Sequence, residues 1–518
     1  MIAISRLDIA KYIYLTGFLG LAIGLPTSKV ILSLSMMLMA LGVLLEWNLL
    51  ERFRNLFANR VFLLLFLFWM MHLVALLWTD NFTYAFSDIR IKISLIVIPI
   101  LIYFDPFEQK HLKIWNYLFI SSLVFTSIFN LLQYHGIILN QHPNDIRGLS
   151  FFGSHIRYGI LIAIGAGLCI VLSEHQKKYV RWCWFLLFLF FSFYTYYSQI
   201  LSGAIGLVSI VFIYIIWKGF GKNKRLGWSL ILSLIVVIIS GVTYLSIHEE
   251  PKIDLKNLPK LTQFGNPYSH NLEPTTFVEG KAVLAYVCEK ELRTEWGKLS
   301  EIAYDSLDLK KQPLRFTLMR YMTSKDLTKD KQGMSQLSTT DIKNVENGIT
   351  SSSEQRAGLL SRISGLRYQI HNSSDPNGHS LLQRLEYWKT AFLIIKENWL
   401  FGVGTGDVDD AFQKEYTTSN SPLIQQNRLR AHNTYLTVWV SFGILGLSLF
   451  LMLLIQFFME CLRGKHLFGI LFISVACITF LFEDTLETQT GASFFAIFFG
   501  LALLQFEGKS KSYSESKI

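Results

Sequence analysis

Long apolar runs constrain this chain more than any other feature of its sequence. A helix needs about 20 mainly apolar residues to cross the hydrocarbon core of a bilayer, and 51% of the residues here are hydrophobic. The runs lie at 11–26, 29–46, 61–78, 86–104, 114–132, 156–173, 182–198, 201–217, 227–247, 434–458, 467–483 and 492–506. They predict an all-α integral membrane protein with about 12 transmembrane helices.

The distribution of lysine and arginine predicts how the spans are oriented, because short loops rich in these residues stay on the cytoplasmic side. Basic residues cluster around 52–60, 177–181, 218–225 and 463–465 and in the C-terminal tail. The opposite short loops carry only Lys29, Arg90, Lys92, Arg147 and Arg157. We therefore expect both termini in the cytoplasm and the long segment 248–432 on the outer side.

The chain then divides into four parts. Residues 1–247 hold the first nine spans, 248–432 form one large outer domain, 433–506 hold the last three spans, and 507–518 form a cytoplasmic tail. Within the outer domain, the polar, proline-containing residues 248–352 indicate a small soluble insertion. Residues 354–432 show helical periodicity, with helices expected at 354–370 and 379–399, and the second is typical of a helix that lies on a bilayer surface.

The net charge of +10 does not indicate a nucleic-acid partner, because it combines the basic cytoplasmic edge with basic residues of the outer domain. The chain also has no CxxC pair and no Cys/His set with the spacing of a zinc site. We therefore expect contact with the lipid bilayer, no nucleic acid and no bound metal ion.

A glycine-rich stretch at 399–407 (WLFGVGTGD) follows the second expected helix. It lacks the GxGxxG spacing, a preceding strand and a Walker lysine, so a nucleotide cofactor is not indicated. Glycine permits backbone conformations that other residues resist. The stretch therefore predicts a tight re-entrant turn.

An ionisable cluster at 430–436 (RAHNTYL) stands where the outer domain meets the next apolar run. Histidine titrates near neutral pH and can accept a proton from a hydroxyl group, while arginine binds phosphate oxygens through paired N–H donors. A histidine at a helix start is also a common interfacial residue, and arginines outside a bilayer bind lipid phosphates. The residues alone leave catalysis and a simple interfacial role both open.

Four motifs in a fixed order resemble the O-antigen ligase and polymerase superfamily. They are 383–389 (QRLEYWK), 399–406 (WLFGVGTG), 430–436 (RAHNTYL) and 442–446 (FGILG). Weaker similarity lies at 147–159 and at 201–203, where the Ser-Arg-Gly usual in the family is Leu-Ser-Gly. The insertion at 248–352 is longer than is usual in that family.

The resemblance implies a GT-C-like membrane glycosyltransferase in the bacterial inner membrane with a periplasmic active site. It implies a glycan donor linked to undecaprenyl diphosphate and no metal or other cofactor. A ligase transfers the glycan to lipid A core, a polymerase transfers it to another glycan, and related members act on protein hydroxyls. Ligase is the first interpretation, because the outer domain is a single large loop after the ninth span.

The same chemistry suggests roles for individual residues. A hydroxyl nucleophile needs a general base, which we predict to be His432. A leaving diphosphate without a metal ion needs arginines, whose charge is permanent. The predicted diphosphate contacts are Arg430 and Arg384, with Arg147 and Arg157 as additions, and the predicted supporting residues are Asn433, His155, Glu483 and Asp484.

Two other classes of protein fit parts of the sequence. A secondary transporter fits the number of spans, although the expected spans are nearly free of charge, whereas transporters place ionisable groups near the bilayer midplane. A non-catalytic scaffold for surface assembly fits the large insertion but leaves the arginine–histidine cluster without a role.

Overall fold

The computed structural model describes residues 6–45, 49–104, 109–139, 146–174, 176–246, 258–271, 277–278, 281–309, 312–352, 376–377 and 380–515. Two compact units can be distinguished. Unit 1 comprises Met1–Leu234 and Gln383–Ile518, and unit 2 comprises Ile235–Leu382.

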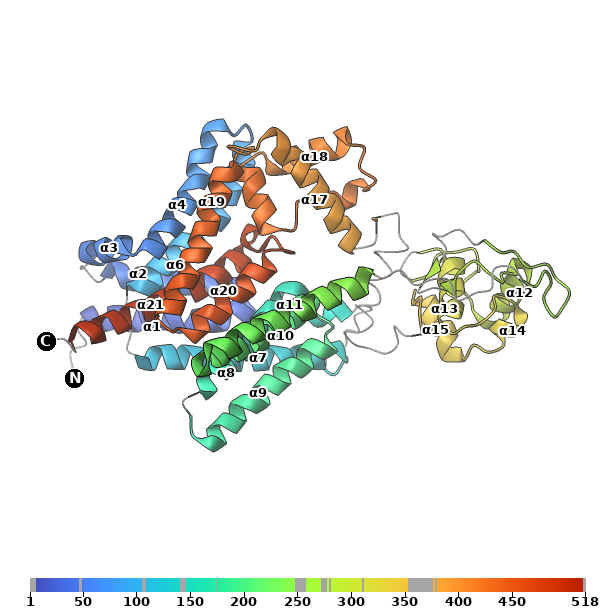
Figure 1. Ribbon diagram of the computed structural model, residues 1–518, viewed down its shortest axis with the longest axis horizontal. Helices are drawn as coiled ribbons and strands as arrows, with labels where there is room; N and C mark the ends of the chain where they lie inside the picture. Colours follow the sequence, from blue (N-terminus) through green and yellow to red (C-terminus); the bar gives the residue numbers. More distant parts are fainter. Residues whose placement is uncertain are drawn as a thin grey trace. The chain divides into compact units, whose positions relative to one another are not determined.

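The N-terminal part of unit 1 is a series of helices (Figure 1), most of them apolar. They are α1 (Arg6–Thr27), α2 (Lys29–Leu45), α3 (Leu49–Ala58), α4 (Arg60–Val74) with the 3-10 turn η1 (Ala75–Trp78), α5 (Phe82–Lys92), α6 (Ser94–Tyr103), α7 (Gln109–Tyr134), η2 (Ile146–Leu149), α8 (His155–Ser173), α9 (Lys178–Tyr197), α10 (Leu201–Lys222) and α11 (Lys224–Ser246). Helix α11 begins in unit 1 and ends in unit 2. Helices α1 and α2 pack against each other, and α8 packs between α9 and α10.

The C-terminal part of unit 1 completes the helical core. Its elements are α17 (Ser380–Glu397), α18 (Val408–Thr418), η4 (Gln425–Asn427), α19 (Thr434–Arg463), α20 (Leu467–Thr479), η5 (Thr485–Glu487) and α21 (Gln489–Glu515). Helix α19 packs on α4, α20 packs on α8 and α10, and α21 packs on α6. The core is aromatic, as where Trp115 stacks on Phe119 and both contact Phe498.

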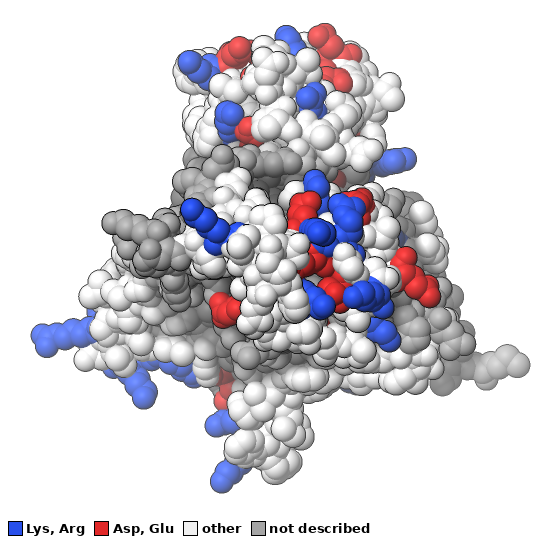
Figure 2. All heavy atoms as spheres, turned by 90° about the vertical axis from the view of Figure 1, so that its right-hand side faces the viewer, with Lys and Arg blue, Asp and Glu red and all other residues white. Residues whose placement is uncertain are grey.

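The predicted class of all-helical, multi-pass membrane protein is confirmed. Among the described residues, seven helices are long and apolar enough to cross a membrane, and three shorter ones are also apolar. The seven are Leu7–Thr27, Arg60–Trp78, Lys110–Tyr134, His155–Ser173, Leu201–Lys222, Lys224–Tyr244 and Thr434–Arg463. The expected count of about 12 spans is not confirmed. Much of the described surface in Figure 2 carries neither acidic nor basic side chains.

Two of the expected spans are interrupted. The run 86–104 forms α5 and α6, with a break at Ile93. The run 434–458 belongs to α19, which has a sharp kink at Gly443, where φ is 63° and ψ is −164°. Hydropathy did not report the kink at Gly443, because apolar side chains continue across it, whereas Asp88, Arg90 and Lys92 stand just before the break at Ile93. The helix expected at 354–370 lies outside the described residues.

Unit 2 contains a small polar fold with its own core. Its described elements are β1 (Phe277–Val278) paired antiparallel with β2 (Lys281–Ala282), α12 (Glu289–Leu299), α13 (Leu314–Ser324), α14 (Lys331–Met334) and α15 (Thr339–Glu346). Trp296, Leu318 and Tyr321 are fully buried at its centre. A capping box of Ser338 and Asp341 starts α15 and satisfies backbone N–H groups that the first turn would leave unpaired.

Candidate functional site

The segment that contains His432 is held by the first turn of α19 and by an acidic turn, residues 480–487. Asn433 is the N-cap residue, and its Oδ1 accepts a hydrogen bond from Leu436 N–H at 3.1 Å. The backbone N–H of Thr434 donates to Phe480 O at 2.8 Å. These bonds join two segments that the sequence separates by nearly 50 residues, so the site forms only in the folded chain.

Asp484 clamps the backbone around His432. Its carboxylate accepts hydrogen bonds from His432 N–H at 2.9 Å, from Asn433 N–H at 3.1 Å and from the Thr437 hydroxyl at 2.6 Å. His432 has a φ of 46°, in the left-handed region. Such a conformation costs a non-glycine residue on the order of 1–3 kcal/mol. The bonds to Asp484 help to offset that cost and fix the backbone from which the histidine side chain projects.

The His432 imidazole lies beside a carboxylate and a tyrosine ring. Its Nδ1 is 4.0 Å from Glu483 Oε2, and its ring centroid is 5.6 Å from that of Tyr387. The side chain is 33% exposed. A base of this kind must be accessible to substrate and must also have a partner that stabilises its protonated form. The surroundings of His432 provide both.

Glu483 is the acidic partner of two cationic groups. Arg384 Nη2 donates to Glu483 Oε1 at 3.1 Å, and Arg384 Nε donates to Phe482 O at 3.3 Å. Burial raises the pKa of Glu483 above its usual value, and the charges of His432, Arg384 and Arg157 lower it only in part. Glu483 therefore brings His432, Arg384 and Arg157 into one electrostatic cluster.

Arg430 belongs to a second cluster, which we call the charge network: Asp88, Lys92, Arg430 and Glu487. Arg430 Nη1 donates to Glu487 Oε2 at 2.9 Å and to the Tyr84 hydroxyl at 2.8 Å. Lys92 Nζ donates to Glu487 Oε1 at 2.8 Å and to Asp88 Oδ1 at 2.9 Å. Although burial raises the pKa of Glu487, the charges of Arg430 and Lys92 outweigh it and hold that pKa well below its usual range.

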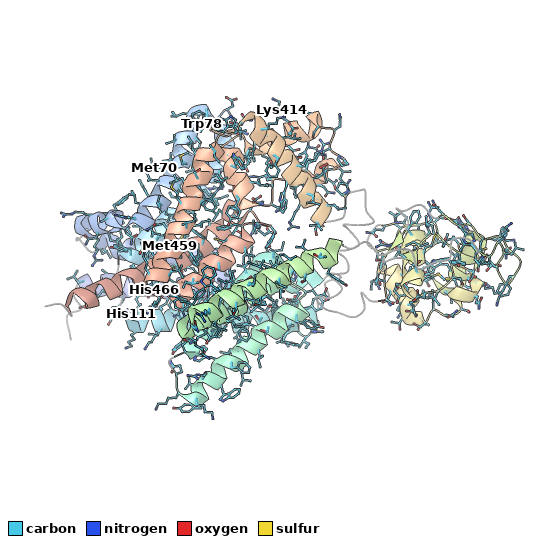
Figure 3. The ribbon with its side chains drawn as sticks, in the orientation of Figure 1. Met70, Trp78, His111, Lys414, Met459 and His466 are labelled. Carbon is cyan, nitrogen blue, oxygen red and sulfur yellow. The ribbon has the colours of Figure 1, made fainter. Side chains whose placement is uncertain are left out.

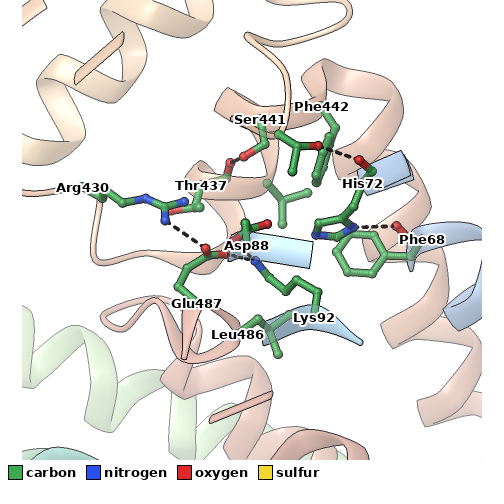
Figure 4. A pocket seen from close by; sticks show the side chains of 12 residues that line it. Phe68, His72, Asp88, Lys92, Arg430, Thr437, Ser441, Phe442, Leu486 and Glu487 are labelled. Atoms are coloured by element: carbon green, nitrogen blue, oxygen red, sulfur yellow. Dashed lines mark hydrogen bonds and ion pairs between the residues drawn. The ribbon is translucent and has the colours of Figure 1, made fainter. Parts of the chain in front are cut away.

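The charge network lines a small polar cavity of about 10 Å³ (Figure 4). A buried water needs roughly that much space. The hydroxyl groups of Thr405, Thr437 and Ser441 and the imidazole of His72 also line the cavity. Thr437 therefore lies between the cavity and the Asp484 clamp.

The glycine-rich stretch forms a tight turn, residues 399–406, packed between α4 and the kink of α19. Val403 N–H donates to Val440 O at 2.8 Å and Gly404 N–H donates to Ser441 O at 3.0 Å. Gly402 and Gly404 have φ values of 72° and 98°, and a Cβ on either would clash with α19 or with Thr79. The predicted turn is thus observed, and it uses carbonyl groups that the kink leaves without helical partners.

The residues of the weaker motif 147–159 differ in how they relate to the site. His155 Nδ1 lies 3.0 Å from the Ser150 hydroxyl, at the start of α8. Arg157 is partly buried in the first turn of α8 and acts on the charge of Glu483. The side chain of Arg147 is outside what the structure describes.

Sequence reasoning missed Asp88, Lys92, Tyr84 and His72. The distribution of basic residues places Lys92 in a short outer loop, although it stands inside the apolar run 86–104. An ionisable residue inside an apolar run is itself a signal of function. That signal was available for Asp88 and Lys92, but their partners Glu487 and Arg430 could not be read from the sequence.

Within the described residues, no group of three or more His, Cys, Asp or Glu side chains is placed to hold a metal ion. The cationic groups near His432 are Arg384 and Arg157, with Arg430 in the adjoining charge network. The arrangement thus offers a base and fixed positive charges.

Comparison with known proteins adds one finding. Residues 335–451 match the family model described as O-Antigen ligase. The match includes Arg384, the tight turn, Arg430 and His432, and it confirms the resemblance to the O-antigen ligase and polymerase superfamily. No curated protein sequence matches the chain.

Proposed function

We propose that this chain, whose residues 335–451 match the family model described as O-Antigen ligase, acts as an O-antigen ligase in the bacterial inner membrane. It would transfer a glycan from undecaprenyl diphosphate to a hydroxyl group of lipid A core on the periplasmic face, with both termini in the cytoplasm. The observation that carries the proposal is His432, held at the backbone by Asp484 and flanked at the ring by Glu483.

In the proposed reaction, the acceptor hydroxyl attacks the anomeric carbon of the donor sugar. The hydroxyl proton passes to His432, the new carbon–oxygen bond forms, and the diphosphate leaves with the electron pair of the broken bond. Glu483 stabilises the imidazolium, since its carboxylate is 4.0 Å away and can approach further once the ring is charged. Base catalysis of this kind contributes roughly 10²–10⁴ to the rate.

The leaving diphosphate needs positive charge close to His432. Arg384 and Arg157 are the leading candidates, because both act on Glu483 and so lie near the imidazole. Arg430 contributes a permanent charge from the adjoining network, and Arg147 remains a further proposed contact. His155 and Asn433 support the site by ordering the starts of α8 and α19. The proposed mechanism uses no metal ion, so activity should persist in EDTA.

The test is glycan transfer by the purified full-length protein in vesicles. His432→Ala should lower transfer at least 100-fold with unchanged protein level and membrane insertion. His111→Ala is the matched control, since His111 lies near the start of α7, away from Trp78 and Lys414 (Figure 3). Normal transfer by His432→Ala would refute the assignment of the base.

A polymerase that extends the glycan, or a transferase acting on protein hydroxyls, would use the same donor and the same base. Deletion of the gene separates them on a gel of surface glycan. Loss of all capped core supports the ligase, core that carries one repeat supports a polymerase, and loss of glycan from a protein supports the third activity.

A secondary transporter is a second candidate because of one observation, the buried charge network beside His72. Uptake into vesicles tests it directly. Solute flux that survives His432→Ala would favour the transporter, whereas the ligase predicts no flux. A non-catalytic scaffold predicts neither flux nor transfer.

A further inference from the structure

The tight turn, residues 399–406, exposes large aromatic side chains and carries no charged one. Trp399 is 56% exposed and Phe401 is 55% exposed. Phe401 lies beside Trp78, with ring centroids 6.0 Å apart, and the neighbouring Leu77 is 84% exposed. A cluster of this kind on a water-facing surface would favour aggregation. What covers these exposed side chains therefore has to be identified.

These aromatic residues cannot turn inward, because the backbone of the turn is fixed on both sides. Ile444 N–H donates to Trp399 O at 2.8 Å, just after the kink at Gly443. On the other side, the Thr405 hydroxyl donates to His72 O at 2.8 Å. The turn is thus hydrogen-bonded to α19 and α4 together.

Helix lengths place the turn at one edge of the hydrocarbon core. The candidate span Arg60–Trp78 has 19 residues and is about 28 Å long at 1.5 Å per residue. The part of α19 after the kink, residues 444–463, is about 30 Å long by the same rise. Both lengths match a hydrocarbon core of about 30 Å. Each segment has an arginine at one end and meets the turn at the other.

The same reasoning gives the depth of His432. Helix α20 has 13 residues, about 20 Å, and begins just after α19 ends. Thr434 bonds to Phe480, at the far end of α20. The half-helix 434–442, about 13 Å long, therefore runs back from the turn toward the bilayer centre. His432 lies about 10 Å deeper than the turn by this estimate.

We propose that the turn 399–406 is a bilayer anchor. Trp399 and Phe401 insert between the lipid headgroups and the upper acyl chains, the region that Trp and other aromatic residues prefer. Because the turn is hydrogen-bonded to α19, its position in the bilayer also sets the depth of the half-helix 434–442, which starts beside His432. The anchor does not depend on which reaction the site performs.

The test measures tryptophan fluorescence of the full-length protein in vesicles of phosphatidylcholine brominated either near the headgroup or near the acyl-chain end. The contribution of Trp399 is the difference between the wild type and Trp399→Phe. We expect lipid brominated near the headgroup to quench this contribution at least twofold more than lipid brominated near the chain end. Aqueous iodide should quench it little. Trp228→Phe is the matched control for the loss of one exposed tryptophan, because Trp228 is also exposed but lies on the candidate span Lys224–Tyr244, outside the turn.

Quenching of the Trp399 contribution by iodide, together with no quenching by either brominated lipid, would overturn the anchor. A second variant, Phe401→Asp, should weaken the quenching of the Trp399 contribution by lipid brominated near the headgroup, because a charged side chain is expelled from the interface. If the quenching pattern holds but the wild type transfers no glycan, the anchor stands and the proposed ligase activity fails. The two conclusions are thus separable.

Discussion

Lys92→Met should destabilise unit 1 through the charge network. Lys92 is only 3% exposed and donates to both Asp88 and Glu487. Methionine has a similar volume and flexibility but no charge, so packing is largely kept. The variant leaves Glu487 with Arg430 as its partner, 2.9 Å away, and leaves the buried Asp88 carboxylate without the ion pair to Lys92.

The magnitude follows from the loss of one buried partner. Removing one member of a buried ion pair costs about 3–5 kcal/mol. The lower end applies here, because Glu487 retains Arg430. A loss of about 3 kcal/mol lowers Tm by roughly 6–12 °C in a domain of 150–250 residues, and by less in unit 1, which is larger. The matched control Lys389→Met removes a lysine that is 64% exposed and pairs with Glu386, and it should cost no more than about 0.5 kcal/mol.

The double variant Lys92→Met/Asp88→Asn separates a shared network from two independent sites. It removes one positive and one negative charge and leaves the Arg430–Glu487 pair neutral overall. We expect it to recover about 1–3 kcal/mol relative to the sum of the single variants. The assays are thermal unfolding in detergent and glycan transfer in vesicles. In the single variant, displacement of the Arg430 segment that raises the activation free energy of transfer by about 1.4 kcal/mol would reduce the rate about tenfold.

Additive effects of Lys92→Met and Asp88→Asn would refute the reasoning, because residues in one network must couple. Wild-type stability of Lys92→Met would refute it as well. Additive effects would mean that Lys92 and Asp88 act independently, and wild-type stability would mean that Lys92 does not stabilise the segment before α19.

Three further predictions concern the turn, the clamp and unit 2. Gly443→Ala should lower the unfolding free energy by about 1–3 kcal/mol or more, because φ is positive there and a Cβ would clash with the backbone of Leu400; thermal unfolding measures it. Asp484→Asn should lower kcat for glycan transfer about 10–100-fold with little change in KM, since it releases the backbone clamp on His432 and not a substrate contact; a change in KM alone would contradict this. Burial raises the pKa of Asp341, but its hydrogen bonds outweigh burial and hold that pKa far below its usual value. A carboxyl group whose pKa is lower in the folded chain stabilises the fold at pH values above its unfolded pKa of about 4. This contribution is lost as the pH falls below that unfolded value toward the folded pKa. The protection of the α15 amides from hydrogen exchange, measured relative to their intrinsic exchange rates in the full-length chain, should therefore fall below pH of about 4, and Asp341→Asn should lose most of that dependence.

Local features were predictable because they depend on neighbouring residues alone. The helix expected at 379–399 is α17, Ser380–Glu397, and the pair of runs around Thr27 forms α1 and α2. The glycines at 402 and 404 indicated a turn, and both have positive φ. The interruption of α19 at Gly443 was not predictable, because it requires the turn 399–406 to supply new hydrogen bonds to the helix.

The candidate site likewise has features that the sequence predicts and others that only the tertiary structure shows. The sequence identified His432, Arg384 and Arg430 by residue type and motif, but it grouped Arg430 with His432 as one cluster. The folded chain pairs Arg430 with Glu487 and Lys92, and pairs Arg384 with Glu483. Asp88 and Lys92 are four residues apart and carried a signal as ionisable residues inside an apolar run, but Glu487, the second partner of Lys92, is 395 positions away and could not be read from the sequence.

By itself, the sequence determined that the chain is a helical membrane protein, and it predicted an ionisable cluster at 430–436. Those properties follow from hydropathy and motif, which are sums over adjacent residues. Only the tertiary structure decided that Asp484 holds the backbone of His432, that Lys92 joins Glu487 across 395 positions, and that α19 is broken. A buried charge or a strained backbone is stable only when partners from elsewhere in the chain compensate it, and the sequence does not state which partners meet.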